Sequence, residues 1–416
     1  MPADRHSYTA HIAVVGKTGG GLADAAHRHG CEITLVFEVG SVSEEQTTRF
    51  DCAVAVPDLT KIDDVAAAVT LLAEQHPVDY LLGVNEHAGI VAADVAEALG
   101  IPTPVTPEVA RLLRDKYAMR RFLAADPTLT VRAHATDRLD DAREHAVEIG
   151  YPLIVKPNDG SGSLAVFKAH DGDSLADAFD AVSRVSPSVL IEEYLEGPEY
   201  SVEAFSHEGE HQILAITRKT KFENFVESGH VIPGLAGQQA EEVESVVRRF
   251  LDTLGVHAGC SHTEVILTPR GPRIVESHNR PGGDGIVTLL ELATGINLAD
   301  LTVGVPTGKR RFPAEPTRAA AAAVAFWTAP PGLIAATPEI SAHDAERCFE
   351  IELPSTVGHE HGQLTHSSDR LGHVVVSGDD PDTVMEQAAA IVARHPYIIN
   401  PVTADGESGG REREEK

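Results

Sequence analysis

Apolar runs alternate with amphipathic stretches along the first hundred residues. The runs HIAVVG, EITLVFE, CAVAV and DYLLGV are mostly apolar, and helical patterns such as VAAAVTLLAEQH and AADVAEALGIP lie between and after them. Strands that are apolar on both faces and are joined by helices are typical of a parallel sheet covered on both sides. The pattern therefore predicts an N-terminal, Rossmann-like α/β domain, which we place at residues 1–103.

A glycine-rich segment, VVGKTGGG, follows the first predicted strand. A phosphate-binding P-loop requires a glycine five residues before its Gly-Lys-Thr, and that position holds His11. The GxGxxG spacing of dinucleotide-binding turns is also absent. We interpret the segment as a tight turn into a helix, which leaves open whether its amides bind a carboxylate or phosphate.

The pattern changes character after Pro104. Residues 106–125 place a proline near the start of an apolar stripe at helical spacing, which predicts one amphipathic helix. Residues 151–170 then predict two strands joined by a glycine- and serine-rich tip at 160–163. Backbone amides in such a tip can hold phosphate oxygens while Lys156, on the adjoining strand, supplies positive charge.

Acidic residues gather on the strands predicted next. The stretch SVLIEEYLEGPEYSVEAF predicts two strands separated by a short break, and HTEVILTPRGPRIVESHNRPGGD predicts a hairpin turned at TPRGP. This hairpin brings Glu264 and Glu276 side by side. Two neighbouring carboxylates repel each other unless a cation lies between them, and oxygen ligands favour Mg²⁺. The sequence therefore predicts a magnesium site at this hairpin.

The last hundred residues mix short strands with one clear helix at Pro381–His395. We expect a C-terminal lobe at 316–403, followed by a disordered tail at 404–416, because the tail has almost no apolar residue. The longest apolar run, Ala319–Trp327, is far shorter than the roughly 20 residues of a membrane helix.

Composition limits the partners that this chain is expected to have. The 416 residues exceed what one core usually serves, so two or three domains are expected. With 63 acidic against 34 basic residues, the formal net charge of −29 argues against nucleic-acid and membrane surfaces and favours small-molecule partners. The 4 cysteines show no CxxC spacing, and no basic segment followed by an apolar one opens the chain, so we expect a cytoplasmic protein.

Taken in order, these features resemble the ATP-grasp superfamily and, within it, the L-amino acid ligases. The resemblance spans nearly the whole chain. It rests on Lys116 in RDKYAMRRFL, Lys156 in IVKPNDGSGS, the hinge EEYLEGPEYSVE, the stretch FVESGHVIPG, and Glu264 with ESHNRPGG. It implies an α/β, ATP-grasp fold with the ATP-grasp domain at 104–315, including a small nucleotide lobe at about 130–195.

The resemblance also implies ATP and Mg²⁺ as cofactors, with Mn²⁺ as an alternative metal, and assigns residues to them. The residues expected to bind the nucleotide are Lys116, Lys156, Gly160, Ser161, Gly162, Ser163, Glu192, Glu193, Tyr194, Leu195 and Glu199. The expected metal ligands are Glu264, Glu276 and His278. The family commonly has asparagine where His278 stands, so Asn279 is the alternative third ligand, although alternation along a strand favours His278.

Further residues are expected at the reacting groups. The resemblance implies that Arg280 stabilises negative charge on the transferred phosphoryl group and on a tetrahedral intermediate, a role that suits a guanidinium. It also makes Glu227 and His230 contacts of the substrate amine or carboxylate. The remaining residues expected to line the substrate pocket are Glu86, Gly282, Gly283 and Asp284.

The implied reaction joins the carboxylate of one amino acid to the amine of a second through an acyl phosphate, with release of ADP and phosphate. The hairpin tip at 160–163 and a loop at 217–234 are the expected lids. Three alternatives stay open: an amine or acyl partner that is not an amino acid, a purine-pathway or biotin-carboxylase-like enzyme, and a non-catalytic nucleotide-binding protein. Many relatives are dimers, so the resemblance also allows a homodimer.

Overall fold

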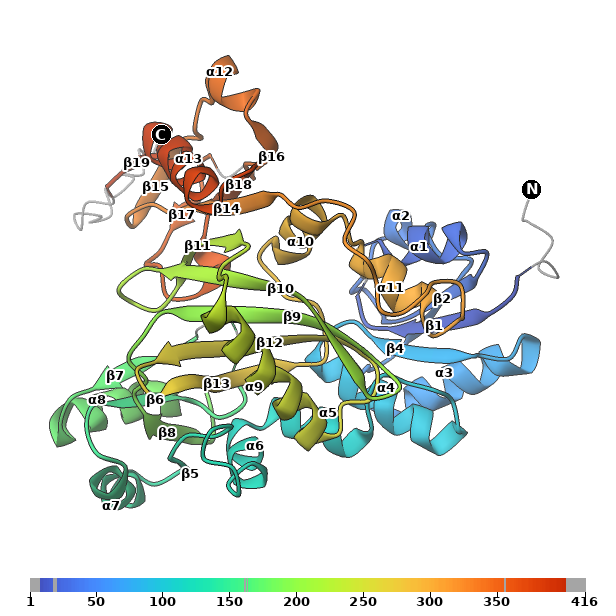
Figure 1. Cartoon of the computed structure of the whole chain (residues 1–416), viewed down its shortest axis with the longest axis horizontal. Coiled ribbons are helices and arrows are strands. Elements are labelled where there is room, and N and C mark those ends of the chain that lie inside the picture. Colours follow the sequence, from blue (N-terminus) through green and yellow to red (C-terminus); the bar gives the residue numbers. More distant parts are fainter. Residues whose placement is uncertain (1–7, 18–20, 161, 163, 355–356, 402–416) are drawn as a thin grey trace, which may run out of the picture.

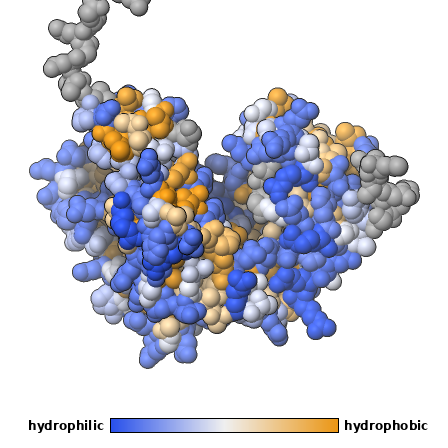
Figure 2. Space-filling model, turned by 90° about the horizontal axis from the view of Figure 1, so that it is seen from above, coloured by the Kyte–Doolittle hydropathy of each residue, from blue (hydrophilic) through white to orange (hydrophobic). Residues whose placement is uncertain are grey.

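Four β-sheets organise the chain, and the computed structural model describes residues 8–17, 21–160, 162, 164–354 and 357–401. Figure 1 shows the N-terminal sheet on the right, the largest sheet across the centre, a small sheet at the lower left and the C-terminal strands above. The surface seen from above is largely hydrophilic and is hollowed between two masses (Figure 2). The expected α/β class with a parallel N-terminal sheet is confirmed.

The N-terminal sheet has four parallel strands in the order β3-β2-β1-β4. Every residue of β1 is buried, because helices cover both faces of the sheet. The turn after β1 includes Gly16, but Thr18, Gly19 and Gly20 lie outside the described residues. The elements are β1 (His11–Val15), α1 (Leu22–Arg28), β2 (Glu32–Glu38), α2 (Glu44–Thr47), β3 (Cys52–Val56), α3 (Ile62–Gln75), β4 (Tyr80–Gly83) and α4 (Glu86–Leu99).

The single helix expected at 106–125 is wrong, because two helices occupy this segment: α5 (Pro107–Arg114) and α6 (Lys116–Phe122). Asp115 separates them with an extended backbone, at φ −92° and ψ 100°. Its side chain accepts a hydrogen bond from the Ala118 backbone N–H at 2.8 Å and so caps α6. The break places Lys116 at the start of α6, where its side chain is buried.

A small lobe is built on an antiparallel sheet in the order β5-β8-β6-β7. Its strands β6 and β7 form the hairpin that the sequence predicts, with Val155 opposite Phe167. Of the expected tip at 160–163, Ser161 and Ser163 lie outside the described residues. The elements of this lobe are β5 (Ala133–Thr136), α7 (Leu139–Ile149), β6 (Leu153–Pro157), β7 (Phe167–Ala169), α8 (Gly172–Ser183) and β8 (Val189–Glu193).

The central sheet has eight strands in the order β13-β12-β9-β10-β11-β14-β18-β16. Strands from the expected C-terminal lobe continue this sheet, since β11 pairs with β14 and β14 pairs with β18. The last hundred residues thus extend the sheet that carries the acidic hairpin. The elements are β9 (Glu199–His207), β10 (Glu210–Lys221), β11 (Glu227–Ile232), α9 (Gln238–Leu254), β12 (Gly259–Thr268), β13 (Gly271–His278), α10 (Ile286–Thr294), α11 (Leu298–Gly304), β14 (Ala321–Trp327), β16 (Cys348–Glu352) and β18 (Gly372–Gly378).

The segment 217–234, expected to be a loop, is mostly the antiparallel hairpin of β10 and β11. Only a short turn joins the two strands. The Phe222 backbone N–H donates to the Val226 carbonyl at 2.8 Å, and Phe225 adopts a left-handed φ of 68°. Sheet pairing on both sides of the hairpin explains why its polar residues are held in a regular strand.

The remaining C-terminal strands form a small sheet in the order β17-β15-β19. The predicted helix at Pro381–His395 is confirmed as α13 (Pro381–Arg394), whereas the tail at 404–416 lies outside the described residues. The other elements here are β15 (Gly332–Ala336), α12 (Ala342–Ala345), β17 (Glu360–His361), the 3₁₀ helix η2 (Ser367–Asp369) and β19 (Ile398–Asn400).

Among the helices within the described residues, none is by itself long and apolar enough to cross a membrane. The pair α10 and α11 meets the length and composition requirement only when the two are taken together, and the chain bends by 90° between them.

Candidate active site

Two adjoining cavities lie along the central sheet, with volumes of about 350 Å³ and about 270 Å³. They share three charged side chains in their walls, Lys219, Glu264 and Glu276. The first cavity lies between the small lobe and the central sheet. The second is bounded by the central sheet, the start of α4 and the segment that contains His366 and Ser367.

Most of the expected nucleotide-binding residues line the first cavity. Apolar side chains such as Ile154 and Ile266 accompany them, which is the mixture that a small-molecule pocket usually presents. Gly162 lines the second cavity instead, while Ser161 and Ser163 lie outside the described residues. The expected nucleotide residues in the first cavity are Lys116, Lys156, Gly160, Glu192, Glu193, Tyr194, Leu195 and Glu199.

Both expected phosphate-binding lysines are buried and are held in place by close partners. Lys116 Nζ donates to the Gly160 carbonyl at 2.6 Å and lies 2.9 Å from Glu276 Oε2. Lys156 Nζ lies 2.5 Å from Glu192 Oε1, and Arg120 lies 3.1 Å from the other oxygen of Glu192. Burial raises the pKa of Glu192, but the charges of Lys156 and Arg120 outweigh it, so the net shift is downward. Glu192 therefore positions Lys156 in the cavity wall.

The acidic pair that the sequence predicts is brought together, because Glu264 on β12 is paired directly with Glu276 on β13. Burial raises the pKa of each carboxyl group, yet both pKa values end well below their usual range. The cause for Glu264 is the charge of Lys219, which outweighs repulsion from Glu276. The cause for Glu276 is chiefly Lys116. Both side chains are therefore anionic at neutral pH.

Lys219 on β10 is the cation at the centre of this site, and it is not among the residues predicted from the sequence. Its Nζ contacts Glu264 Oε1 and lies 3.3 Å from Glu199 Oε1 and 3.4 Å from Glu227 Oε1. Burial lowers the pKa of Lys219, but the three carboxylates outweigh it and raise the pKa well above its ordinary value. The alternating sequence TRKTK was a usable signal, because Lys219 and Lys221 share one face of the strand.

The carboxylate oxygens here suit a hard divalent cation. One oxygen each from Glu199, Glu227 and Glu264 lies within 4.8 Å of the others. Their charge is offset by the Lys219 ammonium, which shows that the group already accommodates a positive charge. A donor set made of carboxylates fits Mg²⁺, which prefers oxygen ligands.

The structure separates the two alternatives for a third metal ligand. His278 Nε2 lies 3.2 Å from Glu276 Oε1, so the imidazole is on the same side as the acidic pair. Its Nδ1 lies 3.4 Å from Glu86 Oε1. Asn279 packs beside Gly89 of α4, where a Cβ on that glycine would come within 3.4 Å of Asn279 Nδ2. The histidine faces the site and the asparagine faces the helix.

Arg280 lines the second cavity and is held there by an ion pair with Glu86. Its Nε and Nη2 donate to Glu86 Oε1 at 2.9 Å and 2.6 Å. Burial raises the pKa of Glu86, but hydrogen bonding and charge from Arg280 outweigh it and lower the pKa to about 2. Gly283 lines this cavity, whereas Gly282 packs behind it, where an added Cβ would come within 2.8 Å of His262 Nδ1.

The far wall of the second cavity contains a buried histidine, His230, whose ring makes no hydrogen bond within the described residues. Neither ring nitrogen of His230 has a hydrogen-bond partner among the described residues, and Nε2 lies 3.8 Å from Asp284 Oδ2. Burial lowers the pKa of His230 despite the nearby carboxylate, so the ring is neutral at neutral pH. Asp284 is ion-paired with Arg370, whose guanidinium lies 3.7 Å from the ring centre of Phe326. Arg370 was not predicted from the sequence, because no local motif links the C-terminal strands to this wall.

A second buried histidine predicts a measurable pH dependence of stability. His262 Nδ1 lies 2.7 Å from Glu203 Oε1. Burial lowers the pKa of His262, but the charge and hydrogen bond of Glu203 outweigh the effect of burial and raise the pKa to about 9. Because the pKa of His262 is higher in the folded protein than in the unfolded chain, the charged imidazole stabilises the fold. This stabilisation is fully present below pH 6.5, the pKa of the unfolded chain, and is lost as the pH rises through about 9. In urea titrations without nucleotide, we expect the free energy of unfolding to fall by about 3 kcal/mol between pH 6.5 and pH 9.5.

The matched variant for this pH prediction is His262→Gln, which keeps a hydrogen-bond donor but cannot carry the charge. Its unfolding free energy should be lower at pH 6.5 and should approach that of the wild type near pH 9.5. Parallel curves for the two proteins across this range would contradict the assignment of a charged imidazole to His262.

Gly197 predicts a stability effect at the hinge between β8 and β9. It has a φ of 150°, and a Cβ there would lie 2.2 Å from the backbone oxygen of Leu267 on β12. Since β12 cannot move without disturbing the acidic hairpin, Gly197→Ala should lower the free energy of unfolding by about 2 kcal/mol, measured by urea denaturation. Gly362→Ala is the control, because nothing lies within 4 Å of a Cβ at that position. Equal stability of the two variants would refute the close approach.

Three family models match successive parts of the chain. The ATP-grasp N-terminal domain matches residues 23–103, the ATP-grasp domain matches 149–288, and the L-amino acid ligase C-terminal domain 2 matches 325–394. A curated relative, alanine–anticapsin ligase from Bacillus subtilis (strain 168), is 25% identical over 270 residues, which are 58% of this chain and 57% of that protein. The chain spans little more than half the length of the first curated relatives it matches.

Solved structures give the same fold over almost the whole chain. The L-amino acid ligase from Bacillus licheniformis superposes with a TM-score of 0.80 at 20% identity, covering 94% of this chain and 99% of that one. Phosphoribosylglycinamide synthetase from Anaerococcus prevotii reaches a TM-score of 0.72 at 17% identity, covering 94% and 100%. Identities this low establish the fold alone. The three family models show that the chain contains ATP-grasp domains and the C-terminal domain type of the L-amino acid ligases.

Proposed function

We propose that this protein is an ATP-dependent ligase that forms an amide bond between an amino acid carboxylate and the amine of a second small molecule. The observation that carries the proposal is the wall shared by the two cavities. Lys219, Glu264 and Glu276 face a cavity of about 350 Å³ on one side and one of about 270 Å³ on the other. A nucleotide in the first cavity and a carboxylate in the second would meet at this wall.

In the proposed reaction, the donor carboxylate takes the terminal phosphoryl group of ATP and becomes an acyl phosphate. The amine then attacks the acyl carbon, and phosphate leaves as the amide bond forms. This route needs no nucleophilic side chain, so the protein contributes positioning and charge stabilisation. Lys116 and Lys156, which line the first cavity, would bind the negatively charged phosphate groups of ATP.

The two glutamates of the shared wall, and two residues beside it, have proposed roles in the reaction. Glu264 and Glu276 would hold Mg²⁺, with His278 facing the same site. When bound, the metal supplies positive charge to the phosphate oxygens. Arg280, which Glu86 holds in the second cavity, would neutralise charge on the acyl group during attack.

The second cavity suggests a polar substrate. Its lining includes Glu227, the neutral His230 and Asp284, while Ile286 is its one aliphatic side chain among the described residues. The unpartnered nitrogens of His230 would accept or donate one hydrogen bond each to a bound substrate. We infer that Glu227 and His230 bind the substrate amine or carboxylate and that Asp284 limits the size of the pocket.

The curated relatives support an amino acid as one reactant. Two of them are named alanine–anticapsin ligase and D-alanine–D-alanine ligase, the latter from Delftia acidovorans (strain DSM 14801 / SPH-1). The structural neighbours also include an N5-carboxyaminoimidazole synthetase from Staphylococcus aureus and a biotin carboxylase from Campylobacter jejuni, solved with bound nucleotides. A carboxylating enzyme is therefore the rival that any assay has to exclude.

The test is a screen of amino acid pairs with ATP and Mg²⁺, in which ADP and phosphate are measured and products are weighed by mass spectrometry. We expect ADP release that depends on a particular pair and a product whose mass equals the two substrates minus water. Wells with bicarbonate and wells with one amino acid plus amines of other classes are run beside them. ADP release with bicarbonate alone would refute the proposed ligase and support the carboxylating rival.

A further inference from the structure

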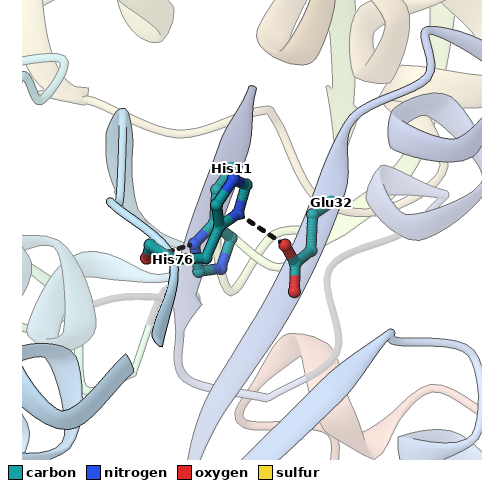
Figure 3. A group of neighbouring side chains, drawn as sticks. All are labelled: His11, Glu32 and His76. Atoms are coloured by element: carbon teal, nitrogen blue, oxygen red, sulfur yellow. Dashed lines mark hydrogen bonds and ion pairs between the residues drawn. The ribbon is translucent and has the colours of Figure 1, made fainter. Parts of the chain in front are cut away.

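A group of metal-binding side chains lies outside the active site, at the amino-terminal edge of the parallel sheet. Figure 3 shows its members: His11 at the start of β1, Glu32 at the start of β2 and His76, which directly follows α3. One ligand atom from each lies within 4.8 Å of the other two. The active-site groups lie at the opposite edge, where Glu86 follows β4, so this group serves no part of the proposed reaction.

Hydrogen bonding fixes the tautomer of His11. Its Nδ1 lies 3.2 Å from the His76 carbonyl oxygen, which can only accept, so Nδ1 carries the proton. Its Nε2 then holds a lone pair and accepts from the Thr34 hydroxyl at 2.9 Å. Anchoring one ring nitrogen to a backbone carbonyl is the arrangement that orients histidines toward metals. His11 Nε2 is therefore the nitrogen able to bind a cation, in exchange for the hydrogen bond from the Thr34 hydroxyl.

Glu32 supplies a buried carboxyl group whose one ion-pair partner among the described residues is His76. The residue is 4% exposed, and its carboxylate accepts from His76 Nδ1 at 2.7 Å. Within the part of the chain that the structure describes, neither a lysine nor an arginine pairs with it. A buried carboxylate in this setting favours a bound positive charge. The His76 side chain is 38% exposed, which gives a cation a route from solvent.

The spacing of the imidazole rings distinguishes this group from a second one on the small lobe. The ring centres of His11 and His76 lie 5.4 Å apart and the ring planes are inclined by 16°, so the partly exposed His76 ring would turn for both lone pairs to point at one ion. Two imidazoles bound to one tetrahedral Zn²⁺ have ring centres about 5 Å apart, given Zn–N distances of about 2 Å. In the other group, His134 and His145 beside Asp141, the ring centres lie only 3.5 Å apart, too close for both lone pairs to point at one ion.

We propose that His11, Glu32 and His76 bind a divalent transition-metal ion of the zinc type. Two imidazole nitrogens and one carboxylate oxygen are the ligand classes that such ions prefer, and water would complete the shell. The ion would replace the proton shared by His76 and Glu32. Bound there, it would tie the end of α3 to the first two strands, and its role is structural.

The test is a calorimetric titration of the full chain with Zn²⁺ after chelator treatment, in excess Mg²⁺ to occupy the acidic site. We expect one Zn²⁺ per chain with micromolar affinity, weakened at least about 100-fold in His76→Ala. His76→Gln keeps a donor for Glu32 but lacks the imidazole, and it should lose the same binding while remaining folded by circular dichroism. His145→Ala is the matched control and should bind as the wild type does.

Two outcomes overturn this proposal. In the first, both His76 variants bind Zn²⁺ with wild-type stoichiometry and affinity. In the second, the wild-type chain takes up no Zn²⁺ in excess Mg²⁺, and the group is a hydrogen-bonded cluster only. Because the titration involves neither ATP nor amino acids, its result is independent of the proposed ligase activity.

Discussion

Glu276→Gln should reduce the rate of ADP release at least about a thousand-fold while the fold is kept. Among the described residues, Glu276 is the one carboxylate that both lines the shared wall and pairs with Lys116, at 2.9 Å. Glutamine has nearly the same shape, but it binds a metal less strongly and does not neutralise the charge of Lys116. Steady-state ADP release in saturating ATP and Mg²⁺ measures the loss, and circular dichroism checks the fold.

The control for this prediction is Glu210→Gln, an exposed carboxylate at the start of β10. It removes the same charge from the chain and should leave turnover within about two-fold of the wild type, since exposed charges away from a site have small effects. A Glu276→Gln protein that keeps more than about a tenth of wild-type turnover would remove Glu276 from the proposed metal site.

Lys219→Met should lower the free energy of unfolding of the nucleotide-free protein by about 3–5 kcal/mol. The substitution leaves Glu199, Glu227 and Glu264 close together without the ammonium that offsets them. Removing one partner of a buried charged group is costly, because the remaining charges stay out of water. Urea denaturation without metal measures the loss.

The same variant should respond strongly to metal, because Mg²⁺ can take the place of the lost ammonium. We expect millimolar Mg²⁺ to raise the melting temperature of Lys219→Met more than that of the wild type. Lys221→Met is the matched control, since Lys221 contacts Glu199 alone at 2.6 Å and is more exposed, and its loss of stability should be smaller. A Lys219→Met protein as stable as the wild type would contradict the account of the acidic group.

Much of the fold could be predicted because local pattern and tertiary structure agree. Continuous apolar strands and intervening helices predicted the parallel sheet, and the TPRGP turn predicted the hairpin that pairs Glu264 with Glu276. The expected single helix at 106–125 failed at Asp115, whose side chain caps a new helix in the middle of a continuous helical pattern. Capping by an aspartate inside such a pattern is hard to distinguish from an exposed polar position.

The parts of the site that local sequence did not predict are contributed by distant segments. Arg370 reaches Asp284 only because β18 and β14 extend the central sheet beyond β11. Lys219 was not predicted because its polar segment was expected to be a loop. The segment is a strand, paired with β9 on one side and β11 on the other. Strand order in a sheet depends on long-range pairing, which single-sequence periodicity does not contain.

The measurement that tests the central claim most directly is the transfer of isotope from substrate to phosphate. The donor amino acid of an active pair is labelled with ¹⁸O in its carboxylate, and the phosphate released in a single incubation is analysed by mass spectrometry. Activation through an acyl phosphate predicts one ¹⁸O atom in each phosphate formed with the product. Unlabelled phosphate, released at the same rate as the product, would contradict the proposed chemistry at the wall formed by Lys219, Glu264 and Glu276.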